Sequence, residues 1–251
     1  MAKSIIFLTT PSSATASIWR ILSTIASKSN YMLNRYTDSF YLSNTIDNIK
    51  TSIPPENDNI ILFNTPDFFN EKIDLSNYKF ILNIRDPRDI LCNQYFWSMQ
   101  HLTWNNDNEK LEENRKNISI QSIDNFVLNK KIDHWIDPIV NVFNRTQSED
   151  RILATYALLC IDFDSYISKL ANFLEIDLSN ELKESLSIER PENLVNNSQW
   201  IGNQWKNADI HPGRFISELK KETATILKER YSIYLNFLAQ NDDAKVQSTY
   251  V

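Results

Sequence analysis

The chain has 251 residues, of which 42% are hydrophobic and 12% aromatic, and this length and composition predict one α/β domain over residues 1–251. Its formal net charge of −6 argues against a broad surface for nucleic acid or an anionic membrane, so any anion site must be local. No apolar run approaches the roughly 18 residues needed to span a membrane. Cys92 and Cys160 lack a metal-ligand spacing, which favours buried thiols in a reducing cytoplasm.

The first predicted strand covers residues 4–10. Its apolar core, IIFL, is shorter than the roughly 7–15 residues of a secretory signal. A helix is predicted over residues 18–28, where isoleucine and leucine recur at the spacing of a core-facing stripe. The loop between them reads PSSATAS, residues 11–17. A strand, a loop of small residues and a helix N-terminus can hold a phosphate, although a Ser/Thr-rich turn gives the same pattern. The loop lacks the glycines and the Lys-Ser/Thr pair of the nucleoside-triphosphatase P-loop, which weakens a kinase interpretation.

The next segments alternate between strand and helix patterns. Strands are predicted over residues 31–36 and 60–63, and helices over residues 42–50 and 68–72. Asp67 lies between the second strand and the second helix, where it could cap that helix.

Residues 78–97 form the stretch around which the chain is organised. The apolar run FILNI predicts a buried parallel strand, and the run RDPRD follows it directly. Asp86 is a natural N-cap and Pro87 fits the first helical position, so a helix is predicted from there to residue 100. Arg85 would then stand beside the N–H groups of a helix start, which predicts a seat for a phosphate. The alternative is a local ion pair between Arg85 and Asp89, four residues away.

The second half of the chain is predicted to be mainly helical. The polar residues 101–117 predict a surface segment without regular structure. The other predictions are a helix over 118–143, bent or divided at Pro138, a last strand over 151–156, a helix over 163–174, a long loop over 189–213 and a final helix over 216–238.

These segments resemble, in order, the nucleotide-binding segments of sulfotransferases that use 3′-phosphoadenosine 5′-phosphosulfate (PAPS). The family has a strand, then Arg-x-Pro-x-Asp, then Ser four residues later and aromatic residues beyond. Arg85, Pro87 and Asp89 match this pattern, and Asn93 stands at the Ser position. The resemblance implies that Arg85 and Asn93 hold the 3′-phosphate of the nucleotide.

The loop at residues 11–17 resembles the 5′-phosphosulfate loop of the same family, Pro-Lys/Arg-Ser-Gly-Thr-Thr. The resemblance implies that its residues hold the 5′ group: Ser12, Ser13, Ala14, Thr15, Ala16 and Ser17. Ser12 replaces the basic residue, Ala14 the glycine and Ala16 the second Thr. In the family, that basic residue neutralises charge on the bridging oxygen as the sulfuryl group leaves. Another cation must therefore serve here, or the activity is weak or lost.

Two further nucleotide segments are implied by the resemblance. Tyr156 would touch the adenine, although a core strand residue is the competing interpretation. Gly213 matches the glycine of the family's Arg-Lys-Gly segment, which closes over the 3′-phosphate, and Arg214 is displaced to its far side.

The catalytic base of the family is the His of a Lys-Thr-His run that ends a strand. Pro66 stands at that position here, and Asp67 is the nearest group able to take a proton. His101 is the second candidate, because its unperturbed pKa of about 6.5 suits a base near neutrality. Asp67 ranks first, since its position corresponds to the end of the family's catalytic strand.

The resemblance implies a three-layer α/β sandwich with a mostly parallel sheet and a P-loop-like nucleotide site at the strand C-termini. It further implies a cytosolic sulfotransferase that moves a sulfuryl group from PAPS to a hydroxyl or amine of a small molecule, without a metal. The product nucleotide would be 3′-phosphoadenosine 5′-phosphate (PAP). Aromatic residues near His101 favour an apolar or ring-containing acceptor, whereas the many acidic residues favour a cationic one, and both stay open. The alternative is a non-catalytic protein on the same fold that binds a nucleotide or a partner, which Ser12 supports. The oligomeric state stays open.

Overall fold

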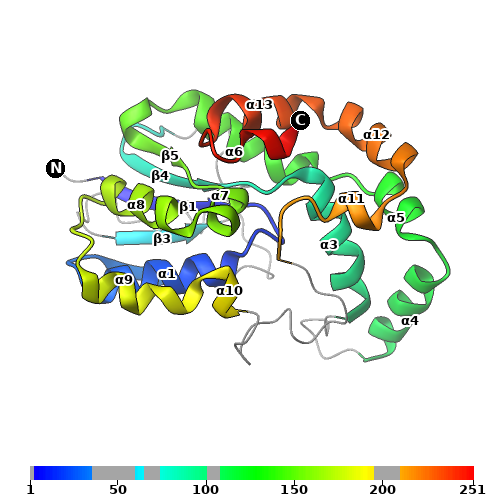
Figure 1. Cartoon of the computed structure of the whole chain (residues 1–251), viewed down its shortest axis with the longest axis horizontal. Coiled ribbons are helices and arrows are strands. Elements are labelled where there is room, and N and C mark those ends of the chain that lie inside the picture. Colours follow the sequence, from blue (N-terminus) through cyan, green and yellow to red (C-terminus); the bar gives the residue numbers. More distant parts are fainter. Residues whose placement is uncertain (1–2, 36–59, 65–73, 101–107, 195–209) are drawn as a thin grey trace.

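The computed structural model describes residues 3–35, 60–64, 74–100, 108–194 and 210–251 (Figure 1). Within them lies a parallel sheet with the strand order β2-β3-β1-β4-β5. Its strands are β1 (Ser4–Thr9), β2 (Met32–Arg35), β3 (Ile60–Asn64), β4 (Tyr78–Asn83) and β5 (Arg151–Leu153). Phe7 in β1 pairs with Phe63 and Ile81 of its neighbours, so the C-terminal ends of these strands meet at one edge of the sheet.

Helices cover both faces of this sheet, which confirms the predicted three-layer α/β architecture. In Figure 1, α1 and α9 lie below the strands, while α6 and α13 lie above them. The helices are α1 (Thr15–Ser27), α3 (Pro87–Gln100), α4 (Asn108–Ser119), α5 (Ile123–Asn129), α6 (Asp133–Arg145), α7 (Tyr156–Ile161), α8 (Phe163–Phe173), α9 (Asn180–Leu186), α10 (Pro191–Leu194), α11 (Phe215–Glu218), α12 (Lys221–Arg230) and α13 (Ser232–Asn241). Short 3₁₀ turns add η3 (Ser148–Asp150), η4 (Ser187–Glu189) and η6 (Gln247–Tyr250).

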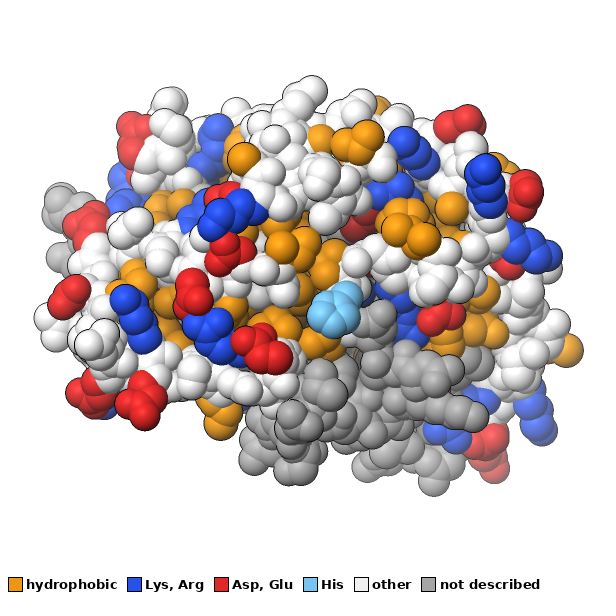
Figure 2. All heavy atoms as spheres, viewed as in Figure 1, with side chains coloured by type: hydrophobic (Ala, Val, Ile, Leu, Met, Phe, Trp, Pro, Cys, Tyr) orange, Lys and Arg blue, Asp and Glu red, His pale blue; other side chains and the backbone are white. Residues whose placement is uncertain are grey.

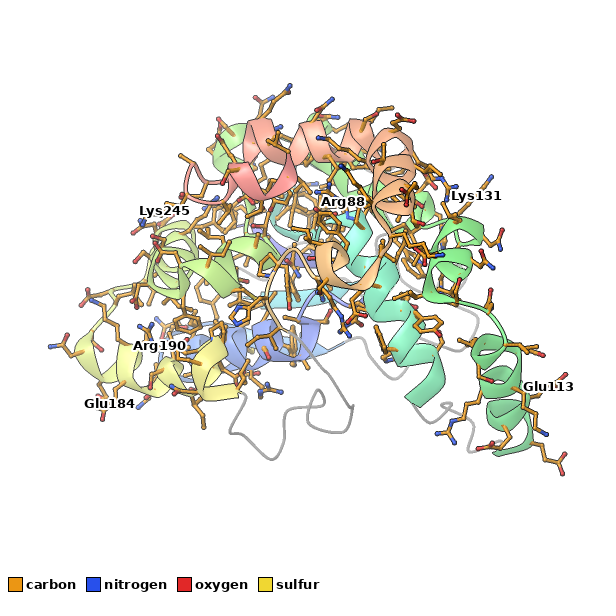
Figure 3. The ribbon with its side chains drawn as sticks, turned by 45° about the vertical axis from the view of Figure 1, so that its right-hand side comes forward. Arg88, Glu113, Lys131, Glu184, Arg190 and Lys245 are labelled. Atoms are coloured by element: carbon orange, nitrogen blue, oxygen red, sulfur yellow. The ribbon has the colours of Figure 1, made fainter. Side chains whose placement is uncertain are left out.

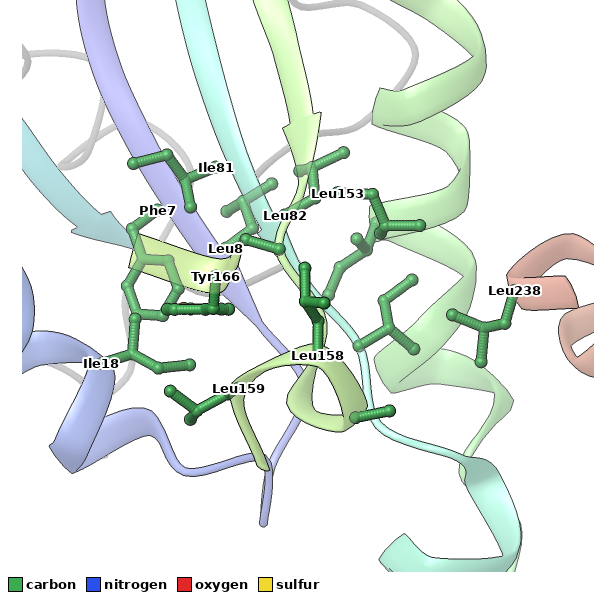
Figure 4. Packing of buried hydrophobic residues seen from close by; sticks show 14 of the residues in the cluster. Phe7, Leu8, Ile18, Ile81, Leu82, Leu153, Leu158, Leu159, Tyr166 and Leu238 are labelled. Atoms are coloured by element: carbon green, nitrogen blue, oxygen red, sulfur yellow. The ribbon is translucent and has the colours of Figure 1, made fainter. Parts of the chain in front are cut away.

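The core lies on both faces of β1 and β4, whose apolar residues are buried. Figure 4 shows Phe7 close to Ile18 of α1 and to Tyr166 of α8. Each fully buried side chain of this kind stabilises the fold by about 1.5–3 kcal/mol through the hydrophobic effect. The core therefore fixes the position of the strand ends, from which the polar residues described below project.

Several sequence predictions for the second half are wrong. Residues 108–119 form α4 instead of an irregular segment, and the predicted helix 118–143 is two helices, α5 and α6. The break falls at Lys130, whose backbone is extended, and not at Pro138. Pro138 lies inside α6, one turn beyond its start, where its missing N–H removes only the bond to His134.

Other element boundaries also differ from the sequence predictions. The last strand ends at Leu153, and Tyr156 begins α7 because Thr155 accepts a hydrogen bond from Leu158 N as its N-cap. The predicted final helix is divided into α11, α12 and α13, with extended backbone at Leu219 and Lys220. The predicted loop 189–213 contains the short helix α10, and the first helix starts three residues early, at Thr15. The predicted helices 42–50 and 68–72 lie outside the described residues.

Some predictions made from composition can be compared with the described residues directly. Cys92 is buried, Cys160 is half-buried, and both are thiols outside any disulfide. No helix among the described residues is long and apolar enough to cross a membrane. On the face shown in Figure 2, acidic and basic side chains are interspersed and form no large patch of one sign.

Candidate functional site

The site is built at the junction between β4 and α3. The strand ends at Asn83, and three residues later Asp86 caps the helix: its Oδ1 accepts a hydrogen bond from Arg88 N at 2.8 Å. Pro87 takes the first helical position, as predicted, where no N–H is needed. Arg85 is thereby held at the sheet edge where the parallel strands end.

Arg85 is buried, with 2% of its surface exposed, yet part of its guanidinium has no acceptor. Its Nη1 donates to the backbone oxygen of Ser12 at 2.8 Å, and its guanidinium carbon lies 4.0 Å from the centre of the Tyr156 ring. Among the described residues, Nε and Nη2 find no hydrogen-bond partner. A buried donor without a partner costs free energy, and more so when it is charged. This arrangement fits a site for an anionic ligand.

Asp89, the alternative partner of Arg85, is occupied elsewhere. It is fully buried and accepts hydrogen bonds from Gly213 N at 2.8 Å and Phe215 N at 3.1 Å. Its distance to Arg85 Nε is 3.9 Å, so the ion pair is loose. Burial raises the pKa of Asp89 to about 6, although Arg85 opposes the shift. The predicted local salt bridge therefore exists, but Asp89 mainly anchors the turn at residues 213–215.

The loop before α1 presents backbone groups beside Arg85. Ser12 and Ala14 both have left-handed backbone, with φ of 62° and 59°. Asn83 holds this shape, because its Nδ2 donates to Thr9 Oγ1 at 2.8 Å and to the backbone oxygen of Ser13 at 2.6 Å. Helix α1 then starts without a side-chain cap and without an acidic residue in its first turn. Uncapped N–H groups at a helix N-terminus attract anions.

The other predicted residues of this loop differ in their surroundings. Ser13 is buried, and its Oγ lies 2.5 Å from Thr10 Oγ1. Thr15, Ala16 and Ser17 form the first turn of α1. Thr15 Oγ1 lies 3.4 Å from Thr9 Oγ1, whereas the Ser17 hydroxyl accepts a hydrogen bond from Arg20. The loop and Arg85 are thus brought together as the sequence predicted, with Thr15 nearer to the strand end than Ser17.

The predicted residues on other elements gather around the same point. Tyr156 lies under Arg85, and its hydroxyl donates to the backbone oxygen of Ile210 at 2.5 Å. Gly213 has a φ of +90°, a conformation that favours glycine. Arg214 forms an ion pair with Glu218 at 3.2 Å and lies over the ring of Phe96. Asn93 is half-buried on α3. Asp67 and His101, the two candidate bases, lie outside the described residues.

A small cleft opens beside Arg85, and the C-terminal residues form one of its walls. Its lining includes Arg85, Asp89, Tyr156, Gly213 and Tyr250. Tyr250 donates its hydroxyl to Asp242 Oδ2 at 2.6 Å, and the same oxygen accepts from Thr155 at 2.6 Å. Arg88, which lies inside the molecule in Figure 3, pairs with Asp86 at 2.6 Å and contacts the backbone oxygen of Tyr250.

The comparisons with known proteins agree with this geometry. The model of the sulfotransferase domain family matches residues 3–211. The chain belongs to the sulfotransferase domain family. No curated protein sequence matches it. The resemblance seen in the sequence is therefore confirmed at the level of the family.

Two of the solved structures that match this chain show that it shares their fold. Mouse sulfotransferase SULT7A1 complexed with PAP is 12% identical, with a TM-score of 0.66, and the match covers 99% of this chain and 89% of that one. Retinol dehydratase in complex with androsterone and the inactive cofactor PAP is 13% identical, with a TM-score of 0.60 and coverage of 96% and 82%. At this identity the likeness establishes the fold, and the site must be argued from its own residues.

Three residues at or beside this candidate site were not predicted. Asn83 shapes the loop, Gln94 donates to Ser12 Oγ at 2.8 Å, and Lys130 donates to Gln94 at 3.3 Å. One signal was present for Asn83, which is a polar residue at the end of an apolar strand. Gln94 and Lys130 are 36 residues apart, so only the tertiary structure shows that they are connected.

Proposed function

We propose that this protein is a PAPS-dependent sulfotransferase that transfers a sulfuryl group to a hydroxyl or amine of a small molecule. The observation that carries the proposal is the buried Arg85 guanidinium, whose Nε and Nη2 find no partner among the described residues. Family membership and the PAP-bound structural neighbours support the same nucleotide.

The chain supplies separate contacts for the two ends of the nucleotide in this proposal. Arg85, with Asn93 on the same helix and the Gly213 turn held by Asp89, would hold the 3′-phosphate. The loop from Ser12 to Thr15 and the uncapped start of α1 would hold the 5′ group. When bound, PAPS supplies an activated sulfuryl group. Transfer of such a group depends mainly on alignment and on stabilisation of charge, which fixed N–H groups provide.

Asp67 is our first candidate for the residue that removes the acceptor proton, and His101 is the second. Loss of a general base typically lowers the rate by roughly 10²–10⁴-fold. We therefore expect Asp67→Ala to lose turnover in that range while PAP affinity, measured by calorimetry, stays unchanged. His101→Ala is the matched comparison. An Asp67→Ala enzyme that keeps most of its turnover would reverse the ranking.

A second candidate function is binding of the nucleotide without catalysis. Ser12 stands where the family has a basic residue, and Arg214 is paired with Glu218 beside the turn at Gly213. These two observations favour a protein that keeps the fold and the nucleotide site but transfers no group.

One assay separates the two functions. PAPS consumption is measured against a mixed panel of hydroxyl- and amine-containing metabolites, and PAP binding is measured in parallel by calorimetry. Turnover on any acceptor supports the sulfotransferase. PAP binding without turnover on any acceptor favours the non-catalytic protein, and absence of binding contradicts both.

A further inference from the structure

Two cationic side chains are connected to Ser12, the residue at the family's basic loop position: Arg85 directly and Lys130 through Gln94. Arg85 donates to its backbone oxygen at 2.8 Å. Lys130 connects to its hydroxyl through Gln94: Lys130 Nζ donates to Gln94 Oε1 at 3.3 Å, and Gln94 Nε2 donates to Ser12 Oγ at 2.8 Å. A continuous hydrogen-bonded chain therefore links the ammonium group of Lys130, the C-cap residue of α5, to the loop at residues 11–17.

The surroundings of Lys130 leave its ammonium group facing Gln94, the first member of this hydrogen-bonded chain. It is half-buried, with its Nζ 5.3 Å from the centre of the Phe126 ring and 5.5 Å from that of Trp135. Burial lowers its pKa. No carboxylate among the described residues lies within ion-pair distance of it, and Gln94 is the described side chain that accepts its hydrogen bond.

The direction of the chain follows from the chemistry of its members. An ammonium group can only donate, so Lys130 requires the Oε1 of Gln94 to face it. The Nε2 of Gln94 must then face Ser12, and the Ser12 oxygen becomes the acceptor. Gln94 is only 8% exposed, and its hydrogen bonds to Lys130 and Ser12 fix the orientation of its amide. The hydroxyl proton of Ser12 can consequently be donated to another acceptor on the loop side.

We propose that Lys130 is a positioning residue that makes Ser12 a hydrogen-bond donor to the 5′ anionic group of the nucleotide. Lys130, Gln94 and Ser12 together would then replace the basic residue that the loop lacks. The inference rests on the proposed function, since it concerns the same nucleotide. Successive hydrogen bonds pointing the same way polarise one another, so the charge of Lys130 strengthens donation by Ser12.

The test removes the charge and keeps the packing. In Lys130→Met the side chain can still pack near the Phe126 and Trp135 rings, but Gln94 can turn its Oε1 toward Ser12 and accept the Ser12 proton. We expect the affinity for PAP to fall about tenfold, as for loss of one hydrogen bond to a charged group. Affinity for adenosine 3′-phosphate, which lacks the 5′ group, should not change. Lys130→Arg should restore most of the affinity for PAP.

Two further variants distinguish this role from a general effect of charge or folding. Lys131→Met removes a neighbouring charge that is exposed and points outward in Figure 3, and it should leave PAP affinity unchanged. Ser12→Ala should cause the same loss as Lys130→Met. Adding Lys130→Met to Ser12→Ala should lower the affinity for PAP no further, because without the Ser12 hydroxyl the hydrogen-bonded chain no longer reaches the ligand.

The outcomes of the calorimetry separate the inference from the function on which it rests. A wild-type protein that binds neither nucleotide overturns the proposed function and this inference with it. Wild-type binding of PAP that Lys130→Met leaves unaltered overturns the inference alone. Equal losses for PAP and adenosine 3′-phosphate, or additive losses in the double variant, would also overturn it, because Lys130 would then act without Ser12.

Discussion

At the scale of single residues, Arg85 explains why this edge of the sheet is suited to an anion. The three nitrogen atoms of its guanidinium differ in their hydrogen bonds: Nη1 donates to Ser12 O, while Nε and Nη2 find no acceptor among the described residues. Tyr156 packs against the flat face of the guanidinium and keeps it in place. A planar fork with two N–H groups available is well matched to a phosphate, which accepts such bonds in pairs.

Arg85→Ala should weaken PAP binding selectively. A charge-assisted hydrogen bond contributes about 1.5–3 kcal/mol, so the affinity should fall roughly ten- to more than a hundredfold. Adenosine 5′-phosphate, which lacks the 3′-phosphate, should lose little. Calorimetry with both ligands measures the difference, and Arg190→Ala, which alters a surface pair with Asp164, is the control (Figure 3). Equal weakening of both ligands would mean that Arg85 is structural.

At the scale of elements, the junction of β4 and α3 joins the two halves of the site. Asn83 at the strand end fixes the loop before α1, while Asp89 in the first turn of the helix fixes the turn at Gly213 and Phe215. Residues 83–89, which span the junction of β4 and α3, therefore position two segments that lie far apart in the sequence. Because Asp89 is buried at this junction, its ionisation affects the stability of the protein.

Asp89→Asn should change how stability depends on pH. The pKa of Asp89 is raised to about 6 in the fold from an ordinary value of 3.8, mainly by burial. Because the folded pKa is higher than the unfolded one, the folded state holds its proton more tightly. The contribution of Asp89 to stability is therefore greatest below about pH 4 and falls as the pH rises to about 6, by roughly 3 kcal/mol.

Urea unfolding of wild type and Asp89→Asn at several pH values measures this effect. At acidic pH the variant should be about as stable as wild type, because the protonated Asp89 carboxyl and the amide of Asn each offer one carbonyl acceptor to the N–H groups of Gly213 and Phe215. Between about pH 4 and pH 6 wild type should lose stability relative to the variant, so a gap should open in favour of Asp89→Asn and then stay constant. A gap that is the same at every pH would show that Asp89 keeps an ordinary pKa.

The elements that sequence reasoning predicted correctly have local causes. The run from FILNI to Asp86 and Pro87 contains its own strand, cap and helix start, so the β4–α3 junction was predictable.

The elements that were predicted wrongly depend on tertiary contacts or are very short. β5 is only three residues long, and α7 begins where Thr155 caps it, so the pattern of residues 151–156 was misleading. The division between α11 and α12 depends on packing, since Asp124 on α5 accepts a hydrogen bond from Lys220 N. Contacts of this kind have no signature in the local sequence.

At the scale of the whole molecule, the C-terminal residues complete the wall of the cleft. Tyr250 is 2% exposed and bonds to Asp242, which in turn holds Thr155 at the start of α7. Arg88 stacks on Phe215 and contacts the backbone oxygens of residues 249 and 250. The family model ends at residue 211, but residues beyond it line the same cleft.

Tyr250→Ala should destabilise the protein by about 3 kcal/mol, because it leaves a cavity and removes a donor from buried Asp242. The free energy of unfolding in urea measures the loss. Val251→Ala is the matched control, since Val251 is 80% exposed and should change stability little. We also expect Tyr250→Ala to weaken PAP binding. A variant as stable as wild type would mean that the segment does not pack against the core.

The position of β1 in the sheet has a consequence for biosynthesis. This strand is made first, but it lies at the centre, between β3 and β4. Its loop takes shape only when Asn83 arrives, 74 residues after Thr9. At about 5–20 residues per second, a nascent chain would carry the apolar run of β1 without its partners for several seconds. During that interval the segment is a natural target for chaperones, and the loop at residues 11–17 takes its shape only after the neighbouring strand has left the ribosome.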